Sequence, residues 1–96
     1  MKKEFCIMPK NNLYEITRFY GSERHEIFFG KNRQKSIDDG LVVFLTPQMH
    51  RGTYGIHGKF GHDFDITLKQ IAEQTWINYY KKNINEFIKK YGKNYL

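Results

Sequence analysis

Short apolar runs in the first half of the chain predict strands. Residues 41–45 are apolar throughout, a pattern typical of a strand that is buried on both faces. Residues 25–29 predict a second strand, which ends at Gly30. The stretch between these strands, residues 31–40, is polar and basic and predicts a loop.

The N-terminal region, residues 4–20, predicts two further short strands. The first covers residues 4–8 and ends at Pro9, since proline cannot donate to a strand ladder. The second covers residues 13–20, which are rich in β-branched and aromatic side chains.

After residue 45 the pattern becomes helical. Thr46 and Pro47 suit the N-cap and the first position of a short helix that carries His50. Arg51-Gly52 ends that helix, and a glycine-rich loop follows over residues 52–62.

Two C-terminal helices are predicted within residues 64–92. Apolar residues spaced three and four positions apart favour a helix whose N-cap is Asp63 or Asp65. Asn83 begins a second helix, and Gly92 ends it.

Length and aromatic content favour one domain with a modest core. A chain of 96 residues has no room for separate cofactor and substrate domains. Seven Tyr, eight Phe and one Trp can close a small core. The helical spacing of Trp76 and Tyr79 places both in that core rather than on a base-stacking surface. We therefore expect a single α+β domain over residues 1–96.

Cysteine content and apolar run lengths indicate the compartment. A single cysteine, Cys6, excludes an internal disulfide. No apolar stretch is long enough for a signal-peptide core or a membrane span. We expect a cytoplasmic protein.

The charge balance favours a polyanionic partner. Sixteen Lys and Arg against ten Asp and Glu give a net charge of +6. Such a balance favours polyanionic partners, although many small basic proteins bind no polyanion.

The histidines are candidate metal ligands. A strand–loop–strand–helix order can bring His25 beside His50, with His57 following from the next loop. Three neutral imidazoles with an open fourth position suit Zn²⁺ or a similar ion. A Mg²⁺ site would normally include oxygen ligands, which Glu26 or Asp63 can supply.

Each histidine also has an ordinary structural interpretation. His25 can be bonded to backbone at a strand edge, and His50 can be a favourable cation at a helix C-terminus. His57 and His62 can be solvated loop residues. Spacing alone leaves both interpretations open.

Several segments follow one another in an order that we interpret as a family pattern. They are Arg24-His25-Glu26-Ile27-Phe28-Phe29-Gly30, Asn32-Arg33-Gln34-Lys35-Ser36, Gly40-Leu41-Val42-Val43-Phe44-Leu45-Thr46-Pro47, Met49-His50-Arg51-Gly52, Gly55-Ile56-His57 and the stretch from Phe87 to Leu96. Together they resemble a family of small HNH-like (ββα-metal) nucleases from phages and prophages. The resemblance implies a ββα-metal core over residues 24–52, preceded by the strands of residues 4–20 and followed by the helices of residues 64–92.

The resemblance also implies roles for individual residues. His25 and His50 would bind a divalent metal ion (Mg²⁺, Mn²⁺, Ni²⁺ or Zn²⁺), and His57 would be a third ligand. Glu26 would occupy the general-base position. The partner would be DNA.

Three departures from the family pattern bear on this expectation. Glu26 stands where a histidine usually acts as base, and a carboxylate is the weaker base at neutral pH. Glu26 can therefore be a ligand instead, with His25 as the base. Gly40 stands where many such proteins carry an asparagine. Cys6 is alone, which excludes a structural zinc site of four cysteines.

Basic residues around the predicted metal site are candidate DNA contacts, because arginine and lysine bind phosphates without reading sequence. These residues are Arg24, Lys31, Arg33, Lys35 and Arg51. The alternative is that these charges solvate a loop, with Arg33 paired to Asp38 or Asp39.

Three functions follow from these expectations. The first is a metal-dependent DNA endonuclease or nickase of phage origin. The second is a catalytically inactive relative that binds DNA or a host protein, for example to interfere with a defence nuclease. The third is a structural phage protein without a metal. The sequence specifies neither the metal, the DNA structure recognised nor the oligomeric state.

Overall fold

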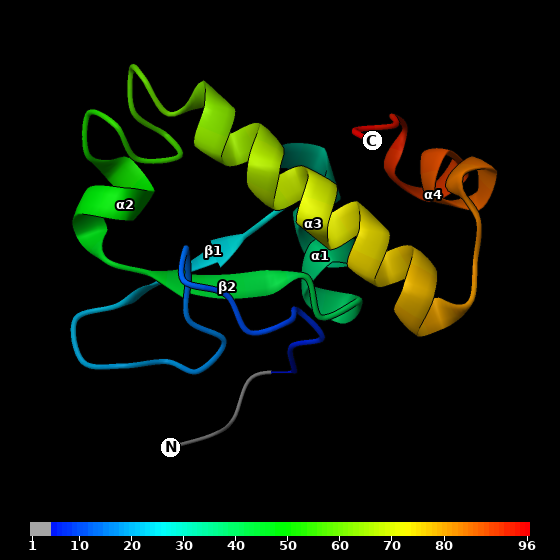
Figure 1. Ribbon diagram of the computed structural model, residues 1–96, viewed down its shortest axis with the longest axis horizontal. Helices are drawn as coiled ribbons and strands as arrows, with labels where there is room; N and C mark the ends of the chain where they lie inside the picture. The colour runs from blue at the N-terminus through cyan, green and yellow to red at the C-terminus, as the bar shows by residue number, and fades with distance from the viewer. Residues whose placement is uncertain (1–4) are drawn as a thin grey trace.

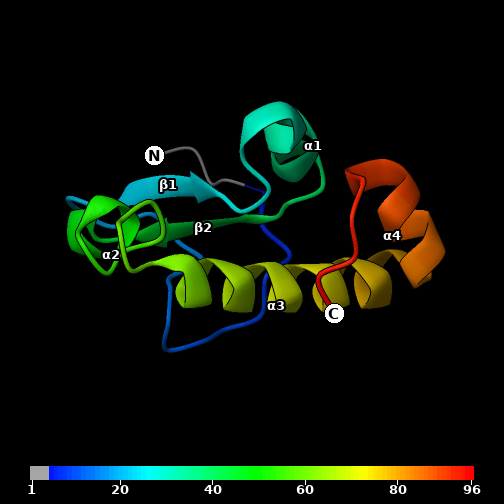
Figure 2. The same cartoon turned by 90° about the horizontal axis from the view of Figure 1, so that it is seen from above.

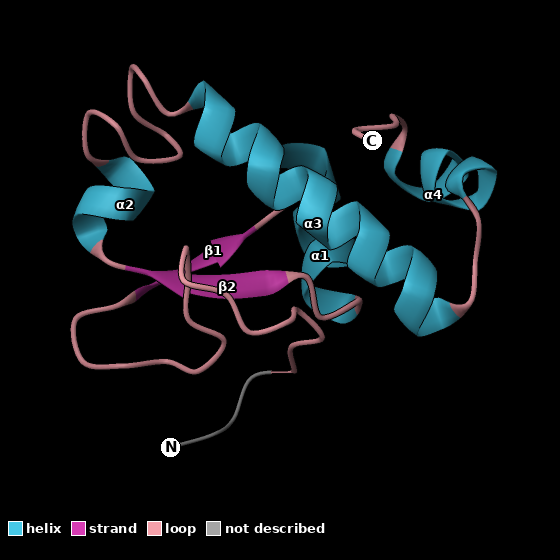
Figure 3. Cartoon of the chain, viewed as in Figure 1, coloured by secondary structure: helices cyan, strands magenta, loops and turns pink. Residues whose placement is uncertain are grey.

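The helices and strands follow one another in an α+β order. The computed structural model describes residues 5–96. Along the chain lie β1 (Glu23–Glu26), a 3₁₀ helix (Gly30–Asn32), α1 (Arg33–Asp38), β2 (Val42–Leu45), α2 (Pro47–Arg51), α3 (His62–Tyr80) and α4 (Ile84–Tyr91). Figures 1 and 3 show a small α+β fold, in which a two-stranded antiparallel hairpin is followed by helices. The α+β class is as predicted, but β1 covers Glu23–Glu26 instead of residues 25–29, because the chain bends at Ile27 and Phe28.

The hairpin places β2 in the interior. β1 and β2 pair in antiparallel register, with His25 opposite Val43. All four residues of β2 are buried, which confirms the prediction from its apolar run. The N-terminal segment runs along the other edge of β2, where Glu15 and Phe44 exchange two backbone hydrogen bonds of 3.1 and 2.8 Å.

The predicted N-terminal strands are wrong for the described residues. Over residues 5–20 there are isolated bridges, Asn11 with Tyr14 and Glu15 with Phe44, and no regular strand. Residue 4 of the first predicted strand lies outside the described residues. Pro9 cannot donate to a ladder, and a turn in which the Leu13 N–H donates to Asn11 Oδ1 interrupts the rest. The segment still supplies two core side chains, Met8 and Tyr14.

The predicted loop over residues 31–40 is also wrong, because it contains the 3₁₀ helix and α1. The polar composition of this stretch gave no helical signal for the short helix α1. One small buried residue holds α1 in place. Ser36 is buried, and its Oγ donates to the Leu41 carbonyl at 2.6 Å and accepts from the Phe28 N–H at 3.2 Å. Gly40 then turns the chain into β2 with φ of +78°, a conformation that favours glycine.

The start of α2 matches the prediction. Thr46 is the N-cap and accepts a hydrogen bond from the Met49 N–H, and Pro47 occupies the first helical position. These two residues fix the direction in which α2 leaves β2, and therefore the position of His50.

The predicted N-cap of α3 needs correction. Its N-cap is Gly61, and Asp63 and Asp65 lie in the first turn, where carboxylates oppose the positive end of the helix dipole. The predicted limits of α4 are confirmed, since Asn83 forms a capping box with Glu86 and Gly92 ends the helix in a left-handed conformation.

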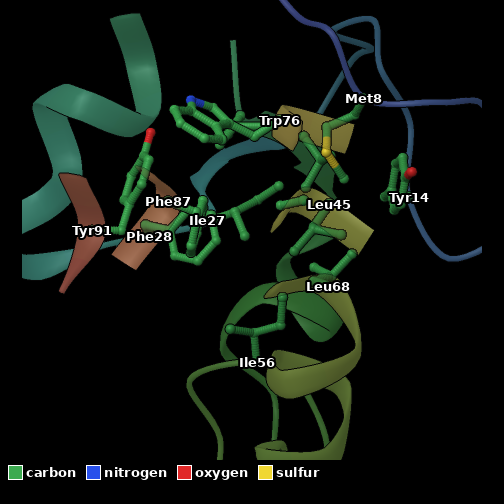
Figure 4. Close-up of a cluster of buried hydrophobic side chains, with 13 residues drawn as sticks. Met8, Tyr14, Ile27, Phe28, Leu45, Ile56, Leu68, Trp76, Phe87 and Tyr91 are labelled. Atoms are coloured by element: carbon green, nitrogen blue, oxygen red, sulfur yellow. The ribbon is translucent and has the colours of Figure 1, made fainter. Parts of the chain in front are cut away.

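The core lies between the sheet and α3, which runs alongside it (Figure 2). Leu68 and Trp76 of α3 meet Leu45 of β2, Phe87 and Tyr91 of α4, and further side chains of the hydrophobic cluster (Figure 4). Trp76 is buried, as predicted. Tyr79 is 55 % exposed, so its predicted place in the core is wrong. Among the described residues, no helix is long and apolar enough to cross a membrane.

Candidate metal centre

Three of the four histidines meet in one cluster. His25 from β1, His50 from α2 and His57 from the following loop each offer one ligand atom, and these atoms lie within 4.8 Å of one another. The ring centroids are 4.9 to 5.3 Å apart. We call these three residues the histidine cluster. No ion is present in the structure, so the fit to a metal rests on the residues themselves.

Backbone geometry explains how residues so far apart in sequence converge. β2 ends beside the start of β1, because Leu45 pairs with Glu23. α2 follows after Thr46, which brings His50 back to the strand that carries His25. The next loop is then held against α2, since the His57 N–H donates to the His50 carbonyl at 2.9 Å.

His25 has the environment expected of a metal ligand. It is 1 % exposed, and its Nε2 has no hydrogen-bond partner among the described residues. Burial, followed by the neighbouring His50, His57 and Lys69, lowers the pKa of His25 to about 3. The imidazole is therefore neutral, as a metal ligand must be. A buried nitrogen without a partner is rare in folded proteins, and a bound cation would satisfy it.

Glu23 orients His50, a contact that the sequence analysis missed. The Nδ1–H of His50 donates to Glu23 Oε1 at 2.9 Å, which leaves Nε2 of His50 as the nitrogen that can bind an ion. Arg51 also donates to this carboxylate, and its hydrogen bond, followed by that from His50, lowers the pKa of Glu23. A carboxylate behind a histidine ligand is a common support in metal sites.

Phe29 and Lys69 also lie beside the histidine cluster, and neither was predicted from the sequence as part of the site. The Phe29 ring lies 4.8 Å from the His57 ring, and Lys69 Nζ lies 4.3 Å from the Phe29 centroid. Burial lowers the pKa of His57, and the charge of a protonated His50 adds to this effect. Lys69 comes from α3, 44 residues after His25 in sequence, so spacing within the ββα segment gave no signal for it.

Glu26, the predicted base, lies outside the histidine cluster as far as the described residues go. It accepts a hydrogen bond from Arg24 at 2.9 Å and another from Arg33 at 2.8 Å. Arg33 therefore pairs with Glu26, rather than with Asp38 or Asp39 as the alternative had it.

The predicted DNA contacts separate into two groups. Arg24, Arg33 and Arg51 lie beside the cluster through their ion pairs with Glu26 and Glu23. Lys35 instead donates to the Lys90 carbonyl at 2.8 Å, which ties α1 to α4. Lys31 is exposed in the 3₁₀ helix.

The remaining candidates lie elsewhere. His62 and Asp63 begin α3 and are exposed. Among the described residues 5–96, neither belongs to the histidine cluster.

Comparison of this chain with protein-family models, with curated proteins and with solved structures found no match.

Proposed function

We propose that this chain is a metal-dependent DNA endonuclease or nickase of the ββα-metal (HNH-like) type, of phage or prophage origin. The observation that carries the proposal is the histidine cluster with the unpartnered, buried Nε2 of His25. The cluster is built on β1, α2 and the loop after α2, and β1, β2 and α2 follow one another in the strand–strand–helix order of such nucleases, with the 3₁₀ helix and α1 between the two strands. The basic residues around it and the net charge of +6 suit a DNA substrate.

In this proposal the histidines hold a divalent ion, and Glu23 orients His50. The bound ion would stabilise the leaving 3′ oxygen and the charge that builds on the scissile phosphate. His25 suits the ligand role better than the base role, because an imidazole with a pKa of about 3 accepts protons poorly.

Glu26 is the proposed general base, and its ion pairs govern when it can act. Each of its oxygens accepts a hydrogen bond from an arginine, so Arg24 and Arg33 compete with water for the carboxylate until one of them moves. A DNA phosphate is a suitable alternative partner for either guanidinium. Binding of DNA would then release Glu26 for catalysis.

The same ion pairs favour a second candidate, a catalytically inactive module. If Arg24 and Arg33 never leave Glu26, the cluster would hold a metal without a base beside it. Such a protein would bind DNA, or a host protein such as a defence nuclease, without cleaving DNA.

The test is plasmid nicking with Mg²⁺, Mn²⁺, Ni²⁺ or Zn²⁺ by purified wild-type protein, His50→Ala and His62→Ala. We expect metal-dependent nicking that His50→Ala abolishes and His62→Ala retains, because His62 is exposed and outside the cluster. Elemental analysis after dialysis should find metal in the wild type and in His62→Ala. Folded wild type that holds metal but never nicks supports the inactive module. Wild type that holds no metal contradicts both candidates.

Glu26→Gln separates the roles of the carboxylate. Loss of nicking with unchanged metal affinity would identify Glu26 as the base. Weakened metal affinity would identify it as a ligand instead.

A further inference from the structure

The loop between α2 and α3 is a regular coil with a repeating sequence. Over residues 53–61 three triplets each end in glycine, with Tyr, His or Phe before it: Thr53-Tyr54-Gly55, Ile56-His57-Gly58 and Lys59-Phe60-Gly61. In each triplet the glycine N–H donates to the carbonyl of the glycine three residues earlier. We call residues 52–61 the glycine coil.

The coil requires glycine because its turns lie in contact. A Cβ on Gly58 would lie 1.8 Å from the Gly52 carbonyl oxygen, and one on Gly61 would lie 1.7 Å from that of Gly55. Both distances are far below any van der Waals contact, and both atoms met are backbone. The glycines thus fix the positions of the side chains between them.

One turn of the coil takes six to seven residues, so side chains three residues apart lie on opposite sides of the coil. The His57 N–H donates to the His50 carbonyl and the Phe60 N–H to the Thr53 carbonyl, each seven residues back. Tyr54 and Phe60, six residues apart, therefore stack, with ring centroids 5.2 Å apart and planes at 26°. His57 lies three residues from each, half a turn away, and joins the histidine cluster.

This aromatic pair, Tyr54 and Phe60, is exposed to solvent. Tyr54 is 75 % exposed and Phe60 is 55 % exposed, and neither belongs to the hydrophobic core. Lys59 Nζ lies 5.3 Å from the Phe60 centroid. Phe60 therefore has Tyr54 and Lys59 as neighbours, while the outer part of Tyr54 faces solvent.

The surroundings of the pair suit an anionic ligand. Lys59 lies beside the pair, and residues 51–61 contain no Asp or Glu. Exposed aromatic rings beside basic side chains are the combination that binds single-stranded nucleic acid, because every base can stack and every phosphate is negative. Two large rings held in water contribute nothing to the core, so this surface suits a ligand better than it suits folding.

We propose that the aromatic pair is a stacking platform for an unpaired base of single-stranded DNA, with Tyr54 as the ring that the base covers. This inference rests on the proposed function and deepens it. Because the coil fixes Tyr54 relative to His57, the stacked base lies at a constant offset along the strand from the phosphodiester bond presented to the histidine cluster. The favoured substrate is then DNA with an unpaired stretch beside the cleavage position, such as a flap or a gap.

The experiment measures binding without cleavage. Fluorescence anisotropy in EDTA follows a labelled single-stranded DNA oligonucleotide, the matching duplex and single-stranded RNA of the same sequence. The proteins are wild type, Tyr54→Ala, Tyr54→Phe and Tyr79→Ala. Tyr79 is the matched control, because it is also an exposed tyrosine and lies near the C-terminal end of α3, away from the coil. Oligonucleotides with 2-aminopurine at successive positions report stacking directly, since its fluorescence falls when it stacks on an aromatic ring.

We expect Tyr54→Ala to weaken single-stranded DNA binding about 10-fold, while Tyr54→Phe and Tyr79→Ala bind as the wild type does. Quenching of 2-aminopurine should be confined to one or two positions and lost in Tyr54→Ala. The proposal is overturned if Tyr54→Ala binds single-stranded DNA as tightly as the wild type, or if Tyr54→Phe loses affinity. It is also overturned if Tyr54→Ala loses affinity for the duplex by the same factor, or if the wild type binds RNA more tightly than DNA.

Since the assay contains no metal, a protein that never nicks but shows this pattern contradicts the nuclease alone. A protein that nicks but shows no effect of Tyr54 contradicts the platform alone.

Discussion

Glu23 shows what single residues contribute to the candidate metal centre. Alternation along a strand places Glu23 on the same face as His25, two residues later, so the sequence held a signal for its proximity. The partner that it binds, His50, comes from α2 and depends on how β2 leads into that helix. The three histidines of the cluster could thus be predicted from the sequence, whereas the hydrogen bond between Glu23 and His50 could be found only from the fold.

Glu23→Gln is expected to weaken metal binding about 10- to 100-fold, because an amide accepts more weakly from the His50 Nδ1–H and loses the charge that favours a cation nearby. Isothermal titration with Zn²⁺ or Mn²⁺ measures the affinity. Glu15→Gln is the control, an exposed carboxylate on the N-terminal segment. Equal affinity of Glu23→Gln and wild type would show that the carboxylate only pairs with Arg51.

His25 makes the stability of the metal-free protein depend on pH. The pKa of His25 is about 3 in the folded protein against an ordinary value of 6.5, so between these two pH values the unfolded chain binds a proton that the folded chain does not. Stability is therefore retained above pH 6.5 and lost as the pH falls below it, by up to about 1.4 kcal/mol per pH unit.

Urea denaturation in EDTA between pH 7.5 and pH 5 measures this slope. The lowered pKa of Glu23 acts below its ordinary value of 4.5, which is outside this range. His62→Gln should keep the slope of the wild type. His25→Gln should reduce the slope, and the lowered pKa of His57 supplies the part that remains. A wild-type slope of zero would mean that His25 is protonated or accessible in the folded state.

At the scale of elements, the glycine coil joins His57 of the histidine cluster to an exposed surface. The sequence predicts a glycine-rich loop but not its regular winding. Period-three glycine is not a pattern of helices or strands, and the contacts that make it obligatory run between turns, as between Gly58 and Gly52. Likewise, α1 was not predicted, because a helix of six residues with one apolar residue, Ile37, shows no hydrophobic periodicity.

Gly58→Ala is expected to open the coil, because the added Cβ meets the Gly52 carbonyl oxygen. We expect a loss of about 1–3 kcal/mol in the free energy of unfolding together with weaker metal binding, since His57 is displaced from His50. Thermal denaturation with and without Zn²⁺ measures both effects. Thr53→Ala, an exposed change in the same coil, should leave both unchanged. A Gly58→Ala protein with wild-type metal affinity would show that the coil does not position His57.

At the scale of the whole molecule, the histidine cluster and the other end of the core depend on different contacts. Asp39 is buried and accepts hydrogen bonds from Trp76 of α3 at 2.8 Å, and from Lys90 and Tyr91 of α4 at 2.8 and 2.7 Å. It thereby joins the end of α1 to both C-terminal helices. The α+β class and both C-terminal helices could be predicted from the sequence, but this junction could not, because its partners are separated by 37 to 52 residues.

Asp39→Asn is expected to lower the free energy of unfolding by about 2–4 kcal/mol, since the amide loses the charge that pairs with Lys90 and turns a donor toward other donors. Metal affinity of the folded protein should stay within about twofold, because the substitution touches no residue of the cluster. Urea denaturation and metal titration measure the two quantities. Asp38→Asn is the control, an exposed neighbour bonded to Gln34. A large change in metal affinity would show that the two ends are coupled.

The winding of the glycine coil limits how long this loop can be. His50 and His57 are seven residues apart, and the backbone hydrogen bond between them joins successive turns. Adding or removing one residue between His50 and His57 would rotate His57 away from its partners, whereas residues added after Gly58 leave the seven-residue separation unchanged. The loop can therefore change in length beyond His57 but not before it. The separation between these two histidines is as much a part of the site as the imidazoles themselves.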